Sequence, residues 1–80
     1  MRIDKFLKVS RLIKRRTVAN EACSGERVTI NGRVVKPSAE VREGDVVSIR
    51  FGNRTVTFRV LNVAETARKE QADSMYEIIQ

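Results

Sequence analysis

The sequence of 80 residues has no histidine and a single cysteine. Without histidine, the chain lacks the side chain that most often acts as a general base at neutral pH. One cysteine, Cys23, excludes an intrachain disulfide and every zinc site built from several thiolates, and a place in the core suits it better than a reactive role. No glycine-rich phosphate loop occurs either. We therefore predict a protein that is not an enzyme and that holds neither a metal nor a cofactor.

Long apolar stretches are also missing. No run approaches the roughly 18 apolar residues that a membrane-spanning helix needs, and the first eight residues lack the apolar segment of a signal peptide. The chain has room for one modest core, and 41% hydrophobic residues are enough to fold it. We therefore expect a single soluble, cytoplasmic domain that does not interact with a membrane.

Acidic residues are scarce at one end of the chain. The net charge is +6, from 16 basic and 10 acidic residues. Residues 1–20 hold one acidic residue, Asp4, and seven basic residues, whereas the charges of residues 21–80 cancel. The seven are Arg2, Lys5, Lys8, Arg11, Lys14, Arg15 and Arg16. A segment in which nearly all charges are positive is typical of proteins that bind a polyanion. A helix face that is merely solvated normally carries charges of both signs.

Apolar spacing predicts a first short helix at this basic end. Ile3, Phe6 and Leu7 recur on one helix face, which favours a helix over about residues 3–10. Asp4 can pair with Lys8, four residues further on. A buried connection is expected to follow, formed by Leu12 and Ile13.

A second short helix is expected after Thr17, whose hydroxyl can cap its first turn. Its apolar face consists of small side chains, which favour close packing against the first helix. These are Val18, Ala19, Ala22 and Cys23. Gly25 suits the position after the last helical residue.

Alternation of apolar and polar residues predicts strands in the rest of the chain. Val28 and Ile30 mark a first strand, and Asn31-Gly32 is a strong hairpin signal before a return strand at Val34 and Val35. Two longer strands are expected further on. Their apolar faces are Val47, Ile49 and Phe51 in one, and Val56, Phe58 and Val60 in the other, which can run on to Val63. Phe51 and Phe58 are both expected in the core.

The end of the chain is expected to fold back on this body. Residues 65–74 are polar and rich in helix-forming residues, and residues 75–79 form an apolar tail that can become an edge strand. The predicted order is α-α-β-β-β-β-α. It describes an α+β fold in which two short N-terminal helices pack on a small antiparallel sheet, followed by a short C-terminal helix and tail.

The basic residues favour an anion site at the second helix. Lys14-Arg15-Arg16 lie just before its first turn, where free N–H groups and the helix dipole attract a phosphate. A membrane-binding helix needs free bulky apolar groups, but Ile3, Phe6 and Leu7 are committed to the core. A helix-turn-helix DNA regulator needs base-reading side chains, and the second helix offers only Asn20 and Glu21. Phosphate and shape recognition of structured RNA is favoured, and a DNA regulator remains the alternative from another class.

Four blocks of the sequence then resemble the S4 RNA-binding domain family. They are residues 2–7 (RIDKFL), 15–19 (RRTVA), 25–32 (GERVTING) and 41–47 (VREGDVV). The resemblance implies the S4-type (alpha-L) fold, with residues 1–64 as the RNA-binding domain and residues 65–80 as a C-terminal helix and tail packed on it.

With its small size and the tail residues 72–76 (ADSMY), the chain resembles the RqcP type of ribosome-associated quality-control factor, and it is also similar to the small bacterial heat-shock S4 proteins. The first resemblance implies a non-catalytic, ribosome-associated protein that docks on obstructed large ribosomal subunits carrying peptidyl-tRNA. Its partners are then 23S rRNA, the tRNA and an RqcH-type tailing factor, which it supports in C-terminal alanine tailing. The alternatives are large-subunit recycling in heat stress and ribosome assembly. Nothing in the sequence indicates a dimer seam, so a monomer is expected.

The resemblance also selects the residues of the RNA surface. In S4 domains this surface is the helical pair and the adjoining loop, which here implies Arg2, Lys5, Lys8, Arg11, Lys14, Arg15, Arg16 and Asn20. Asn31 and Lys36 are expected on the rim. Asp4 is expected to orient the surface by pairing with a nearby cation, and Thr17 to orient the start of the second helix.

Overall fold

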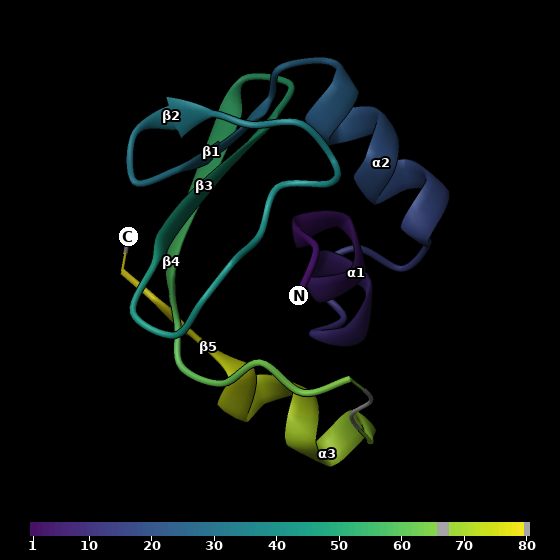
Figure 1. Ribbon diagram of the computed structural model, residues 1–80, viewed down its shortest axis with the longest axis vertical. Helices are drawn as coiled ribbons and strands as arrows, with labels where there is room; N and C mark the ends of the chain where they lie inside the picture. Colours follow the sequence, from purple (N-terminus) through teal and green to yellow (C-terminus); the bar gives the residue numbers. More distant parts are fainter. Residues whose placement is uncertain (66–67, 80) are drawn as a thin grey trace.

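The computed structural model, described for residues 1–65 and 68–79, packs short helices against one antiparallel sheet (Figure 1). The helices are α1 (Ile3–Val9), α2 (Arg16–Ser24) and α3 (Lys69–Ala72), which continues into the 3-10 turn η1 (Asp73–Met75). The strands are β1 (Val28–Ile30), β2 (Arg33–Val34), β3 (Val46–Phe51), β4 (Arg54–Val60) and β5 (Tyr76–Ile78). They lie in the order β2-β1-β3-β4-β5. The predicted α+β class is confirmed.

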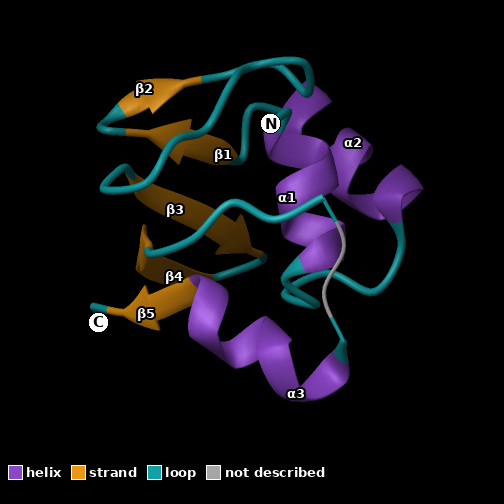
Figure 2. Cartoon of the chain, turned by 60° about the horizontal axis from the view of Figure 1, so that its bottom comes forward, coloured by secondary structure: helices purple, strands orange, loops and turns teal. Residues whose placement is uncertain are grey.

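The sheet has an inner face, covered by α1 and α2, and an outer face on which none of the described helices lies (Figure 2). The register sets Val28 opposite Ile49, and Val47 opposite both Ile30 and Phe58. All five side chains are buried in the core on the inner face. Residues between them in sequence point to the outer face, because side chains alternate along a strand.

The core joins the helices to the sheet through aromatic contacts. Ile3, Phe6 and Leu7 of α1 are fully buried, as their spacing predicts. The ring of Phe6 stacks on that of Phe58, with centroids 6.2 Å apart, and Phe58 meets Tyr76 of β5 edge-on at 5.7 Å. Phe58 therefore links the helical layer, the centre of the sheet and the C-terminal strand.

Two local predictions are confirmed at the edges of the sheet. Asn31 and Gly32 both have positive φ angles, 52° and 86°, as a two-residue hairpin turn requires. The apolar tail forms the edge strand β5, and the backbone N–H of Leu61 donates to the carbonyl of Met75 at 2.8 Å where β4 ends. β4 ends at Val60 and does not reach Val63.

Two apolar residues expected to be buried are exposed. Phe51 is 42% exposed because it lies opposite Arg54 at the tip of the β3–β4 hairpin, beyond the part of the sheet that the helices cover. Val18 is 46% exposed on α2, and Ala19, Ala22 and Cys23 alone form the buried face of that helix.

Helix boundaries differ from the sequence prediction at two places. α2 begins at Arg16, and Arg15 stands at its N-cap position without a side-chain cap, so Thr17 is inside the helix and is not its cap. The helix expected over residues 65–74 is shorter, since α3 begins at Lys69, after the extended Arg68, and ends at Ala72; residues 66–67 lie outside the described part. None of the described helices is long and apolar enough to cross a membrane.

The two phenylalanines of the β3–β4 hairpin offer a matched test of this core. We expect Phe58→Ala to lower the free energy of unfolding by about 3–5 kcal/mol, because it leaves a cavity between Phe6 and Tyr76. Phe51→Ala removes the same atoms from an exposed site and is expected to cost less than about 1 kcal/mol. Urea unfolding followed by circular dichroism measures both. Equal losses would contradict the assignment of Phe58 as the centre of the core.

Candidate nucleic-acid interface

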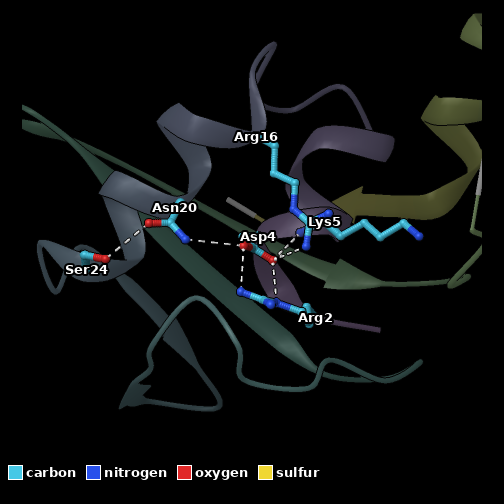
Figure 3. A network of polar contacts seen from close by, with 6 residues as sticks. All are labelled: Arg2, Asp4, Lys5, Arg16, Asn20 and Ser24. Atoms are coloured by element: carbon cyan, nitrogen blue, oxygen red, sulfur yellow. Dashed lines mark hydrogen bonds and ion pairs between the residues drawn. The ribbon is translucent and has the colours of Figure 1, made fainter.

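The carboxylate of Asp4, only 2% exposed, is the centre of a polar cluster at the helical end of the molecule (Figure 3). Arg2 donates to it through Nε (3.2 Å to Oδ1) and Nη2 (3.1 Å to Oδ2). Arg16 donates from Nη2 to Oδ1 at 3.4 Å, and Asn20 from Nδ2 to Oδ2 at 3.5 Å. The backbone N–H of Lys5 donates to Oδ1 at 2.8 Å. We call Arg2, Asp4, Arg16 and Asn20 the Asp4 cluster.

Neighbouring elements hold the members of the Asp4 cluster in place. Arg2 forms an isolated antiparallel bridge with Glu40, so the chain before α1 is fixed against the loop after β2. Arg16 and Asn20 are four residues apart and therefore share one face of α2. Ser24, four residues further, donates from Oγ to Oδ1 of Asn20 at 3.5 Å, which orients the amide toward Asp4.

Burial by itself would raise the pKa of the Asp4 carboxyl. Hydrogen bonds from Arg16 and Asn20, together with the charges of Arg16 and Arg2, outweigh that effect and hold the pKa of Asp4 below its ordinary value. Asp4 is therefore ionised at neutral pH. The expected pairing with a nearby cation is found, but the partners are Arg2 and Arg16 and not Lys8, which is exposed on the solvent side of α1.

Both guanidinium groups of the Asp4 cluster remain open to solvent. The side chain of Arg2 is 50% exposed and that of Arg16 46% exposed, so each has N–H groups free for a second ligand. With Asn20, Thr17 and Glu21, they line a hollow of about 500 Å³ above the buried carboxylate. Thr17 thus lies in the candidate site, although it does not cap the helix.

Further cations lie on α1 and on the segment between α1 and α2. Lys8, Arg11, Lys14 and Arg15 are exposed, and within residues 1–65 and 68–79 none of them forms an ion pair. Lys5 differs, because its Nζ lies 2.7 Å from a carboxylate oxygen of Glu65. We call these five cations and the Asp4 cluster the helical surface. Its donors and charges suit a polyanion with several phosphates.

The two residues predicted for the rim are not among those that line the hollow at the Asp4 cluster. The Asn31 side chain donates to Asp45 at 3.0 Å and accepts from the backbone N–H of Val46 at 3.0 Å, so it ties the β1–β2 turn to the start of β3. Lys36 lines a separate hollow with Cys23 and Pro37. The sequence prediction missed Glu65 and Glu21, because no local pattern relates Glu65 to Lys5, which is 60 positions away.

Similar proteins place the chain in a family. The model of the S4 domain matches residues 1–47, which include α1, α2 and the Asp4 cluster. The chain belongs to the S4 domain family. It is 58% identical over 78 residues to the RQC P-site tRNA stabilizing factor of Halalkalibacterium halodurans, covering 98% of this chain and 89% of that protein. The Bacillus subtilis protein of the same name is 51% identical over 79 residues, covering 99% of this chain and 92% of that protein.

A solved structure extends the comparison to the whole fold. Heat shock protein 15 of Vibrio cholerae superposes with a TM-score of 0.90 at 29% identity, covering 98% of this chain and 80% of that one. The S4-type fold is therefore confirmed, as is the resemblance to the standalone quality-control and heat-shock S4 proteins.

The lowered pKa of Asp4 predicts a pH dependence of stability. Because this pKa is lower in the folded chain than in the unfolded chain, the carboxylate stabilises the fold above about pH 4, and the contribution is lost as pH falls through the lowered value. We expect Asp4→Asn to reduce the free energy of unfolding by about 1–2 kcal/mol at pH 7. The difference from wild type should shrink between about pH 4 and pH 2.

Urea unfolding at pH 7, 4 and 2.5 measures this dependence. Glu43→Gln is the control, because Glu43 is exposed and forms no ion pair with the described residues. A difference between Asp4→Asn and wild type that stays constant with pH would show that Asp4 contributes through packing alone.

The thiol of Cys23 is expected to be inert in the folded chain. Burial, with a smaller contribution from the Asp4 charge, raises the pKa of Cys23 to about 11. At pH 8 the thiolate fraction is then on the order of 100-fold below that of a free cysteine with pKa 8.5. Alkylation by iodoacetamide, followed by mass spectrometry, should be slower by a factor of this order in the native chain than in 8 M urea. Equal rates would place Cys23 at the surface.

Proposed function

We propose that this chain is a non-catalytic RNA-binding factor of ribosome-associated quality control. In this proposal it docks on obstructed large ribosomal subunits that carry peptidyl-tRNA, and contacts both 23S rRNA and the tRNA. The observation that carries the proposal is the Asp4 cluster, in which one buried carboxylate holds two half-exposed arginines beside further exposed cations. The names of the two bacterial relatives, which refer to P-site tRNA, support the same role.

The geometry of the Asp4 cluster explains how the helical surface binds RNA. Arg2 and Arg16 are already oriented before binding, so little side-chain entropy is lost when they take a phosphate. Asp4 lies at the base of the same hollow, only 2% exposed, and the two arginines that pair with it outweigh its single negative charge. Phosphate contacts of this kind fix position and do not read sequence. They suit a structured RNA that is recognised by shape.

On the ribosome, the bound chain would stabilise peptidyl-tRNA by neutralising closely spaced phosphates of the tRNA and of 23S rRNA. A stabilised peptidyl-tRNA supports an RqcH-type tailing factor during C-terminal alanine tailing. In this proposal the protein is ribosome-associated in the cytoplasm and acts as a monomer. Residues 1–64 form the RNA-binding domain and residues 65–80 pack on it, which agrees with the pairing of β5 with β4.

A heat-stress role in recycling large subunits is the second candidate. The close superposition on heat shock protein 15 of Vibrio cholerae favours it. Loss of C-terminal alanine tails in cells that lack this chain would support the first role, and unchanged tails the second. A helix-turn-helix DNA regulator is disfavoured, because the amide of Asn20 donates to Asp4 and is not free to read a base.

The helical surface can be tested by reversing one exposed charge. We expect Arg15→Glu to weaken binding to purified large subunits that carry P-site tRNA, and to reduce the slope of log K against log salt by about 1. The fold should be retained, since an acidic residue is favourable at the N-cap of α2. Binding is measured by sedimentation at several salt concentrations.

Arg33→Glu is the matched control. Arg33 is an exposed arginine of the edge strand β2, away from the helical surface, and its substitution makes the same change in charge. It should bind within twofold of wild type. An equal loss in both variants would mean that net charge, and not the helical surface, drives association.

A further inference from the structure

The outer face of the sheet is a second polar surface. Most of its side chains are hydroxyls and arginines, which the register of β1, β3 and β4 sets on the side opposite the buried core residues, and Val34, Val46 and Glu77 share this face. The hydroxyls and arginines include Thr29, Ser48, Arg50, Thr55, Thr57 and Arg59. None of these residues belongs to the helical surface.

One part of the outer face is hollowed. A depression of about 260 Å³ is lined by Glu26, Arg27, Thr29, Val34, Ser48, Arg50 and Thr55. Arg27 and Arg50 are neighbours there, since the backbone N–H of Arg50 donates to the carbonyl of Arg27 at 2.9 Å. Both side chains are exposed, and neither forms an ion pair within the described residues. We call this depression the outer hollow.

We propose that the outer hollow is a second phosphate site, which takes the sugar–phosphate backbone of an RNA segment other than the one on the helical surface. This inference rests on the proposed RNA-binding function. Two guanidinium groups against the single carboxylate of Glu26 leave a positive balance that complements a phosphate. The hydroxyls of Thr29 and Thr55 are hydrogen-bond donors for phosphate oxygens and partners for ribose hydroxyls, whereas the Ser48 hydroxyl is shared with that of Thr57 at 3.0 Å.

The chemistry of the outer hollow favours the RNA backbone over unpaired bases. Base recognition on a sheet uses exposed aromatic side chains on which bases stack. The outer hollow has none, because Phe58 and Tyr76 point to the inner face. An RNA strand would therefore be held through its phosphates and riboses, without a preference for sequence.

Because the two binding faces lie on opposite sides of one sheet, the chain can hold two RNA segments at the same time. The molecule measures 28 × 25 × 22 Å, so two RNA backbones bound to the helical surface and the outer hollow are separated by little more than one protein diameter. A chain with the helical surface alone holds one RNA segment. A chain with both can fix one RNA relative to another, which is what stabilising a tRNA against rRNA requires.

The test separates the outer hollow from the helical surface. The ¹⁵N-labelled chain carrying Arg15→Glu is titrated with a purified tRNA transcript, and amide shifts are followed at Thr29, Ser48, Arg50 and Thr55. Those amides are expected to shift although the helical surface is weakened. Adding Arg50→Gln should reduce the affinity by about 3- to 10-fold, because one phosphate contact is lost.

Two single-charge variants serve as controls. Arg33→Gln makes the same change in charge but lies opposite Ile30, on the inner side of the sheet, and should alter the affinity by less than twofold. Glu26→Gln removes the one carboxylate of the outer hollow and should strengthen binding. Circular dichroism checks that each variant is folded.

The inference is overturned if the outer amides do not shift, or if Arg50→Gln and Arg33→Gln weaken binding equally. The outcome is independent of the ribosomal role. If the outer hollow binds the tRNA transcript while the wild-type chain does not sediment with large subunits, the proposed quality-control function fails and the second RNA site stands.

Discussion

The buried carboxylate of Asp4 is the interaction on which the arrangement of the basic helices depends. It joins the residue before α1 to the first two turns of α2 through Arg2, Arg16 and Asn20. Like charges placed this close repel one another, and a shared counter-charge at about 3 Å offsets the repulsion. Because Asp4 follows the fully buried Ile3, packing of the core determines where both guanidinium groups point.

A second constraint is the size of the core. One sheet with helices on a single side is the simplest way for a short chain to bury an apolar layer. Phe58 lies in the middle of that layer, between Phe6 and Tyr76. This two-layer arrangement leaves the outer face of the sheet uncovered by the described helices, so the protein has two surfaces available for ligands.

Elements whose signals are local were predictable from sequence. The spacing of Ile3, Phe6 and Leu7 predicts α1 and its buried face, and Asn31-Gly32 predicts the hairpin because only a few residue types accept two positive φ angles. The burial of Phe51 depended on its neighbours and was predicted wrongly. Phe51 alternates as a core residue does, yet it lies opposite Arg54 at the tip of the β3–β4 hairpin and is exposed.

By itself, the sequence determined the α+β class, the concentration of positive charge in residues 1–20 and the burial of most apolar positions, since these follow from composition and short-range periodicity. Only the tertiary structure decided that Asp4 pairs with Arg2 and Arg16, and that Lys5 meets Glu65. It also brought Arg27 beside Arg50 across two strands. These contacts join residues as many as 60 positions apart in the sequence. They form because of how the helices and strands pack, and no local sequence pattern predicts them.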